Sequence, residues 1–247
     1  MPMILSDTFA DRLVRRLESI DILSPEERQA ILDLPLEVRS FGADQDIVAE
    51  GERPTRSCLV VEGFLFRYKL VADGKRQIFS FHIPGDIPDL HSLHLGHMDH
   101  SLAALTDCTV ALVSHRAIDE LVANRPRLAL TLWRKTLIDA AASRAWMISL
   151  GRRSAFARIA HLYCEMLTRL ESVGLGTRAQ ARLPITQAVL ADALGLSLIH
   201  VNRMLAEIKR RGLIMREGAM VSVPDWNALA QAADFDPTYL HLRRRGD

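Results

Sequence analysis

The segment that decides the architecture of this chain is Leu183–Ile214, LPITQAVLADALGLSLIHVNRMLAEIKRRGLI. Thr186 can cap a short helix, Gly195 allows a tight turn, and Ser197 can cap a second helix. Apolar residues recur at helical spacing in both halves and should face inward: Val189, Leu190, Ala193, Leu194, Val201, Met204, Leu205 and Ile208. The segment therefore predicts two packed helices joined by a sharp turn, the helix-turn-helix motif.

The outward surface of the second predicted helix carries polar and basic side chains. Asn202 and Arg203 point away from the core near its N-terminus, where such a helix enters the major groove of DNA. Lys209 and Arg210 near its end suit contacts with phosphates. The following run, GLIMREGAMVSVP, predicts the hairpin of a winged motif. The expected DNA-binding residues are Thr186, Gln187, Ser197, Ile199, His200, Asn202, Arg203, Lys209 and Arg210.

Upstream, the range Ser40–Val113 follows a different pattern. Runs such as CLVVEGFLFRYKLVADGKRQIFSFHI are rich in β-branched and aromatic residues, and Asp73-Gly74 is a strong hairpin signal. Short strands with turns about every ten residues predict a compact β-barrel or β-roll. Before this range, the run SPEE predicts a helix capped by Ser24, with Glu27 completing a capping box.

A long helix is expected from Pro126 to Leu150, because alanine and leucine dominate and neither glycine nor a second proline interrupts the run. The helix is apolar on more than one face, which predicts burial on more than one face. A β-roll offers only one side, so the second face favours packing against a partner copy over purely internal packing. The expected dimer-contact residues are Trp133, Leu137, Ala141 and Ile148.

Composition indicates a globular protein, with 49% hydrophobic and 25% charged residues. No apolar run reaches the roughly 20 residues that a membrane helix needs, and the first residues lack the order of a signal peptide. Three scattered cysteines fit a reducing compartment, so we expect a cytoplasmic protein without membrane contact. Residues 152–247 carry 14 Lys and Arg against 9 Asp and Glu, whereas residues 1–151 carry 17 against 21. This asymmetry favours the C-terminal part as the one that meets an anionic partner.

These motifs resemble the cyclic-AMP receptor / fumarate-nitrate regulator family of bacterial transcription factors over nearly the whole chain. The run PITQAVLADALGLSLIHVNRML is similar to the family's DNA-binding motif, and HIPGDI is similar to the turn before its effector pocket. The resemblance implies an α+β fold in three parts. These are N-terminal helices with a β-roll effector domain of the cyclic-nucleotide-binding type (1–125), a dimerisation helix (126–150) and a winged helix-turn-helix DNA-binding domain (151–247). It further implies a homodimer on an inverted-repeat operator in double-stranded DNA, with RNA polymerase as another partner.

Two departures from the family pattern bear on specificity. Family members commonly carry a polar or charged pair after the serine that opens the recognition helix, where this chain has Leu198 and Ile199, although the arginine one turn further on is kept as Arg203. Members that bind cyclic AMP hold its phosphate with an arginine, whereas no arginine or lysine occurs here from Asp86 to Ser114. A cyclic phosphate would lose its charge-assisted contact, so we expect cyclic AMP to bind weakly or not at all.

By position, the effector pocket is expected at Gly85, Asp86, His100 and Ser101, with a protonated His100 as the best substitute for the arginine. The family's iron–sulfur variant needs a cysteine cluster near the N-terminus. The first cysteine here is Cys58, so no iron–sulfur cluster is expected.

The stretch DLHSLHLGHMDHS, Asp89–Ser101, places four histidines at three-residue intervals: His91, His94, His97 and His100. On one continuous helix this spacing sweeps around the surface, so at most two adjacent histidines could meet at one ion, and the sequence assigns no metal site. Three interpretations stay open: polar pocket or surface residues, contacts to an organic or anionic effector, and a metal- or haem-sensing regulator. An enzyme with a regulatory β-roll is the other class kept open, although the sequence has no Gly-rich phosphate loop and suggests no catalytic residue.

Overall fold

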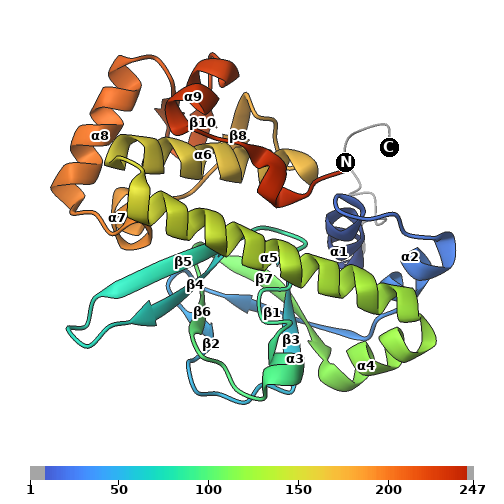
Figure 1. The fold of residues 1–247 in the computed structure, drawn as a ribbon. Coiled ribbons are helices and arrows are strands. Elements are labelled where there is room, and N and C mark those ends of the chain that lie inside the picture. Colours follow the sequence, from blue (N-terminus) through green and yellow to red (C-terminus); the bar gives the residue numbers. More distant parts are fainter. Residues whose placement is uncertain (1–8, 244–247) are drawn as a thin grey trace, which may run out of the picture. The chain divides into compact units, whose positions relative to one another are not determined.

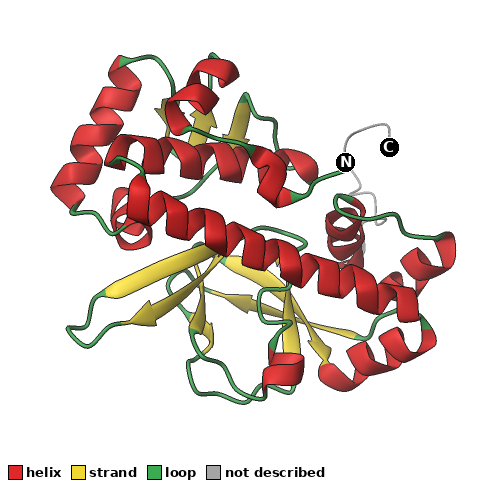
Figure 2. Cartoon of the chain, viewed as in Figure 1, coloured by secondary structure: helices red, strands yellow, loops and turns green. Residues whose placement is uncertain are grey.

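The computed structural model describes residues 9–243, which form two compact units (Figure 1). The first unit holds the described residues up to Tyr68, Phe81–Asp139, and Leu242 with Arg243. The second unit holds Lys69–Ser80 and Ala140–His241. Both units combine helices and strands (Figure 2), as the α+β prediction requires.

Seven strands, arranged in two antiparallel sheets, are the frame of the N-terminal part. They are β1 (Leu36–Phe41), β2 (Asp46–Val48), β3 (Arg56–Glu62), β4 (Leu65–Leu70), β5 (Arg76–His82), β6 (Ser101–Ala104) and β7 (Cys108–Ser114). One sheet has the strand order β1-β7-β3, and the other has the order β2-β6-β4-β5. The predicted β-roll is therefore confirmed. Its interior is filled by apolar side chains such as Leu65, Leu102 and Val110, because the inward faces of both sheets are apolar.

Four helices accompany these strands: α1 (Phe9–Glu18), α2 (Pro25–Leu32), α3 (Ser92–Leu95) and α4 (His115–Asn124). The predicted capping box of α2 is present, because Ser24 and Glu27 each accept a hydrogen bond from the other's backbone N–H. α1 lies outside the helices predicted from the sequence, and it packs Leu13 and Leu17 into the same apolar cluster as Ile87.

The long predicted helix is confirmed as α5 (Pro126–Arg152), two residues longer than expected. The boundary between the two units falls within it, between Asp139 and Ala140. Residues on one stripe of α5, including Leu128 and Ile138, are buried in the first unit's apolar cluster.

The second unit contains the predicted pair of short helices. Its elements are α6 (Ala155–Ser172), β8 (Gln180–Arg182), α7 (Gln187–Leu194), α8 (Leu198–Arg210), β9 (Met215–Glu217), β10 (Met220–Ser222), α9 (Trp226–Ala233) and the 3-10 helix η1 (Pro237–Leu240). Ser154 caps α6. The wing hairpin turns at Gly218 and is joined by β8 in a sheet of order β8-β10-β9. β8 has only three residues, and its pairing with β10 supplies the partner that so short a strand needs.

Candidate nucleic-acid interface and effector region

The helix-turn-helix of the second unit forms as predicted. Thr186 Oγ1 accepts a hydrogen bond from Val189 N (3.3 Å), and Ser197 Oγ accepts one from His200 N (3.2 Å). Each hydroxyl thereby satisfies a backbone donor that has no partner inside its helix. Gly195 ends α7 in the left-handed conformation (φ 62°), and the chain bends by 109° between α7 and α8. This angle lies within the range of about 90–120° that is typical of the motif.

The N-terminal part of α8 presents an exposed surface. Ile199 is 82% exposed, Asn202 and Arg203 are exposed, and His200 is half-buried. A groove of about 810 Å³ runs along the neighbouring face of α8, between α7 and the wing. Four predicted residues line this groove together with a wing arginine that the sequence did not single out: Thr186, Gln187, Asn202, Lys209 and Arg216.

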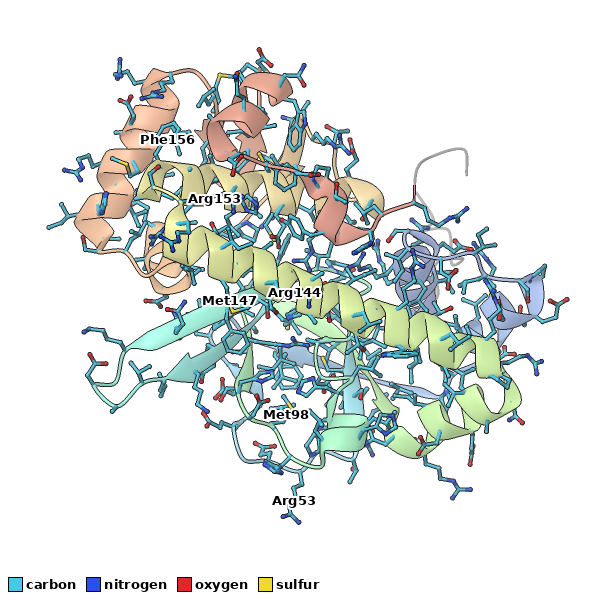
Figure 3. All side chains as sticks on the ribbon, in the orientation of Figure 1. Arg53, Met98, Arg144, Met147, Arg153 and Phe156 are labelled. Carbon is cyan, nitrogen blue, oxygen red and sulfur yellow. The ribbon has the colours of Figure 1, made fainter. Side chains whose placement is uncertain are left out.

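The basic end of α8 is partly neutralised within the helix. Arg210 donates to both carboxylate oxygens of Glu207 (2.8 and 2.7 Å), and Arg211 donates to one of them (2.6 Å). The hydrogen bonds from Arg210 and then Arg211 lower the pKa of Glu207 to about 2. Arg211 also lies over the ring of Phe156, 4.6 Å from the ring centroid (Phe156 is labelled in Figure 3). Arg203, by contrast, makes no ion pair with any residue from 9 to 243.

α5 carries a row of large apolar side chains that the single chain leaves uncovered. These residues are 53–64% exposed; the first three follow one another at three- and four-residue intervals, and the last two lie near the C-terminal end of the helix: Leu130, Trp133, Leu137, Met147 and Ile148. Figure 3 marks Met147 near the C-terminal end of this row. Ala141, expected among the dimer contacts, is buried in the single chain.

The histidine stretch of the first unit does not form one continuous helix. α3 is a single turn, and Gly96 follows it in the left-handed conformation (φ 76°). Met98, labelled in Figure 3, then anchors the chain, because its side chain is buried and its backbone exchanges hydrogen bonds with Gly51 (2.7 Å) and Glu52 (2.9 Å).

This reversal brings the first and last histidines of the stretch together. The rings of His91 and His100 stack with their centroids 5.1 Å apart, whereas His94 and His97 are exposed. The expectation that only adjacent histidines can meet is wrong, because it assumed a continuous helix. His100 Nδ1 lies 2.8 Å from Asp99 Oδ1, and one donor atom each from His91, Asp99 and His100 lies within 4.8 Å of the other two.

The surroundings of both histidines disfavour the protonated form. Burial first, and then the positive charge of Arg67, lower the pKa of His91 to about 4, and the same two causes lower the pKa of His100. Burial and Arg67 thus oppose the protonated form of His100 that was expected to substitute for the family's arginine. Its neighbour Ser101 is buried, and its Oγ accepts a hydrogen bond from Glu50 N (3.0 Å).

Two cations near these histidines were not expected from the sequence, because they come from distant segments. Arg67 of β4 donates from Nη2 to the carbonyl of Pro88, and its Nε is buried with no hydrogen-bond partner among the described residues. Lys135 of α5 is 3% exposed and pairs with Asp139 (2.6 Å). Although the segment Asp86–Ser114 contains no arginine or lysine, the folded unit therefore places cations from other segments near these histidines. A charged residue inside the apolar run FLFRYKL was the available signal.

Gly85 and Asp86, expected in the effector pocket, are covered by α1 instead. The Asp86 carboxylate is 1% exposed and accepts a hydrogen bond from Arg16 Nε at 2.7 Å. Gly85 has a φ of 97°, and a Cβ at this position would lie 2.5 Å from the carbonyl oxygen of Arg12. Gly85 and Asp86 therefore pack against α1 and hold it on the β-roll. Of the expected pocket residues, only His100 and Ser101 belong to the region around the stacked histidines.

Within residues 9–243, no single helix has the length and apolar composition to cross a membrane; the bent pair of α7 and α8 meets these two criteria jointly.

Known proteins match the chain along most of its length. Residues 157–232 match the Crp-like helix-turn-helix domain, and residues 38–125 match the cyclic nucleotide-binding domain. The nitrogen fixation regulation protein FixK of Rhizobium meliloti is 30% identical over 198 residues, which are 79% of this chain and 86% of that protein. The transcriptional activator protein FnrL of Cereibacter sphaeroides is 28% identical over 214 residues, 85% of this chain and 86% of that protein.

A solved structure supports the same family. FixK2 from Bradyrhizobium japonicum matches with a TM-score of 0.72 and 28% identity, covering 81% of this chain and 98% of that one. The chain therefore belongs to the Crp/Fnr family of transcription regulators, with an N-terminal domain of the cyclic-nucleotide-binding type, a long helix and a C-terminal helix-turn-helix domain for DNA binding.

Proposed function

We propose that this regulator acts as a homodimer on an inverted-repeat operator, with the N-terminal part of α8 from each subunit in a major groove. The observation that carries the proposal is the exposed face of α8 with Asn202 and Arg203, presented beyond a 109° bend. An arginine can bond to both O6 and N7 of guanine, and an asparagine can do the same with N6 and N7 of adenine. The 82% exposed Ile199 can contact only an apolar group such as a thymine methyl.

The other predicted residues would position the exposed face of α8 on the DNA. In this proposal Thr186, Gln187, Ser197 and His200 contact the sugar–phosphate backbone at the start of each helix, where backbone N–H groups and hydroxyls suit anions. Lys209 contributes a phosphate contact at the other end of α8, and Arg210 contributes less than its charge suggests because Glu207 already engages it.

Dimerisation is assigned to α5. From Leu130 to Leu137 its exposed apolar row has the three- and four-residue spacing of a helix–helix seam, and Ile148 lies on the same side of the helix about three turns beyond Leu137. A second copy related by a two-fold axis would set the row against itself and remove it from water. Trp133, Leu137 and Ile148 are the proposed contacts, and the two-fold axis of the dimer would match the symmetry of the operator.

In the same proposal, residues 1–125 form the effector domain, 126–150 the dimerisation helix and 151–247 the DNA-binding domain. A small effector binds the β-roll near His100 and Ser101, and family membership supports RNA polymerase as a partner, a cytoplasmic location and a role without catalysis.

The test combines operator selection with a dimer variant. Selection from random-sequence DNA, followed by a mobility shift with excess nonspecific DNA, should return an inverted repeat. Leu137→Glu would bury an unpaired charge at the seam, so sedimentation should show a monomer that has lost most operator affinity, because two linked half-sites become one. Ile22→Glu is the control: Ile22 is 57% exposed but lies outside α5, so this variant should remain a dimer. A Leu137→Glu protein that still sediments as a dimer contradicts the assignment.

A further inference from the structure

We propose that His91, Asp99 and His100 form a binding site for one divalent transition-metal ion of the zinc class. One donor atom from each residue lies within 4.8 Å of the other two. Two imidazoles and a carboxylate are the donor set that Zn²⁺ and its neighbours prefer, whereas Mg²⁺ and Ca²⁺ take oxygen ligands. Three protein ligands would leave one tetrahedral position for water.

The fold builds this juxtaposition through its backbone. His91 immediately precedes α3, and His100 immediately precedes β6. Between them, the left-handed Gly96 and the buried Met98 reverse the direction of the chain, so the two rings stack at an angle of 29° with their centroids 5.1 Å apart. The backbone C=O and N–H of Met98 are hydrogen-bonded to Gly51 and Glu52. These two bonds hold the segment between His91 and His100 in place.

The surroundings of His91 and Asp99 favour the binding of an ion by these side chains. His91 Nε2 is buried and has no hydrogen-bond partner among the described residues, which is a costly state for a ring nitrogen unless a ligand occupies it. Asp99 already lies against His100 through a 2.8 Å contact, and its side chain is 75% exposed, so it can turn towards an ion with little rearrangement.

The site must contract to bind. In a tetrahedral site, two ligand atoms are about 3.4 Å apart when each bond to the ion is about 2.1 Å long. The widest pair in the cluster, at up to 4.8 Å, therefore needs to close by about 1.4 Å, through rotation of the two rings and of the exposed Asp99 carboxylate. The charge of Arg67 opposes a cation here, so the affinity should be lower than that of a closed zinc site with four ligands.

Two other histidines of the same stretch provide a matched control. His94 and His97 are exposed and lie outside the cluster of donor atoms. If metal binding came merely from a histidine-rich surface, these residues would contribute to it. If it comes from the proposed site, they are dispensable.

The experiment uses the full chain without an affinity tag, stripped of metal with a chelator and dialysed against Zn²⁺. We expect one Zn²⁺ per chain, and with Co²⁺ as a probe a visible absorption band of a four-coordinate ion. His91→Ala and Asp99→Asn should each weaken binding at least about tenfold, while His94→Ala/His97→Ala should bind like the parent. Asp99→Asn alters an exposed side chain, so it should fold even if a change at the buried His100 does not.

Absence of stoichiometric Zn²⁺ binding by the parent, or binding that disappears in His94→Ala/His97→Ala and persists in Asp99→Asn and His91→Ala, overturns the assignment. The measurement is made on the protein without DNA. Its failure therefore leaves the proposed operator recognition untouched.

Discussion

Replacing Glu207 by glutamine should steepen the salt dependence of DNA binding. The Glu207 carboxylate accepts hydrogen bonds from both Arg210 and Arg211 at the end of α8. The substitution removes this negative charge and leaves the shape of the side chain almost unchanged. Arg211 keeps its second contact, the ring of Phe156, so Arg210 is the cation that gains freedom to reach a phosphate.

The magnitude follows from the number of phosphates that the freed arginines neutralise. Each additional phosphate contact changes the slope of log K against log salt by about −0.9. One freed arginine per subunit gives about −1.8 for a dimer on both half-sites. Between about 50 mM and about 200 mM salt, the ratio of variant to parent affinity should therefore fall about twelvefold.

The assay is fluorescence anisotropy with a labelled operator over a series of salt concentrations. Glu171→Gln is the matched control, because Glu171 pairs with Arg178 (2.8 Å), both residues lie outside α7 and α8, and the substitution changes the net charge equally. If Glu207→Gln gives the parent's slope, or if Glu171→Gln steepens the slope as much, the end of α8 does not lie at the phosphates and this placement of α8 is refuted.

Arg203→Ala should cost about 1–3 kcal/mol of discrimination at one base pair per half-site, which competition between the operator and single-base variants measures; unchanged selectivity would remove Arg203 from the groove. Asp86→Asn leaves the Arg16 guanidinium buried without its partner charge and should lower the free energy of unfolding by about 3–5 kcal/mol, as read from urea denaturation. Burial first, and then the charge of Arg153, lower the pKa of His161 to about 4 in the folded state, so the unfolded state takes up the proton first as the pH falls below 6.5. This group should therefore remove about 2 kcal/mol of stability between about pH 7 and about pH 5, and His161→Gln should lose less over that window; an equal loss in both proteins would assign the pH dependence to other groups.

The candidate DNA interface was largely predictable because its signals are local. A cap residue acts on a backbone N–H three positions away, and a glycine in the turn acts on its own φ angle, so Thr186, Gly195 and Ser197 could be assigned without knowing the rest of the fold. Even there, sequence spacing gave no hint that Glu207 engages Arg210 with both carboxylate oxygens, since which of the charged neighbours on a helix pair with one another depends on their rotamers.

The sequence predicted the effector region less well, because residues from distant segments of the chain come together to form it. Asp86 was expected to face a ligand, but it pairs with Arg16, 70 residues earlier in the chain. Arg67 and Lys135 come from β4 and α5, far from the histidine stretch in sequence, yet both charges act on His91. The spacing of residues within one segment cannot reveal such contacts, because the partners lie in other segments of the chain.

The two capped helices, the turn between them and the long helix that is apolar on two faces follow from the sequence alone, because they depend on neighbours within about one helical turn or on a repeating pattern of side chains. The tertiary structure was needed to show that His91 and His100 stack while His94 and His97 are exposed. It also decided that α1 covers Gly85 and Asp86. Both outcomes follow from long-range packing, the burial of Met98 in one case and of the Arg16–Asp86 pair in the other, and burial depends on the whole fold rather than on the local run of residues.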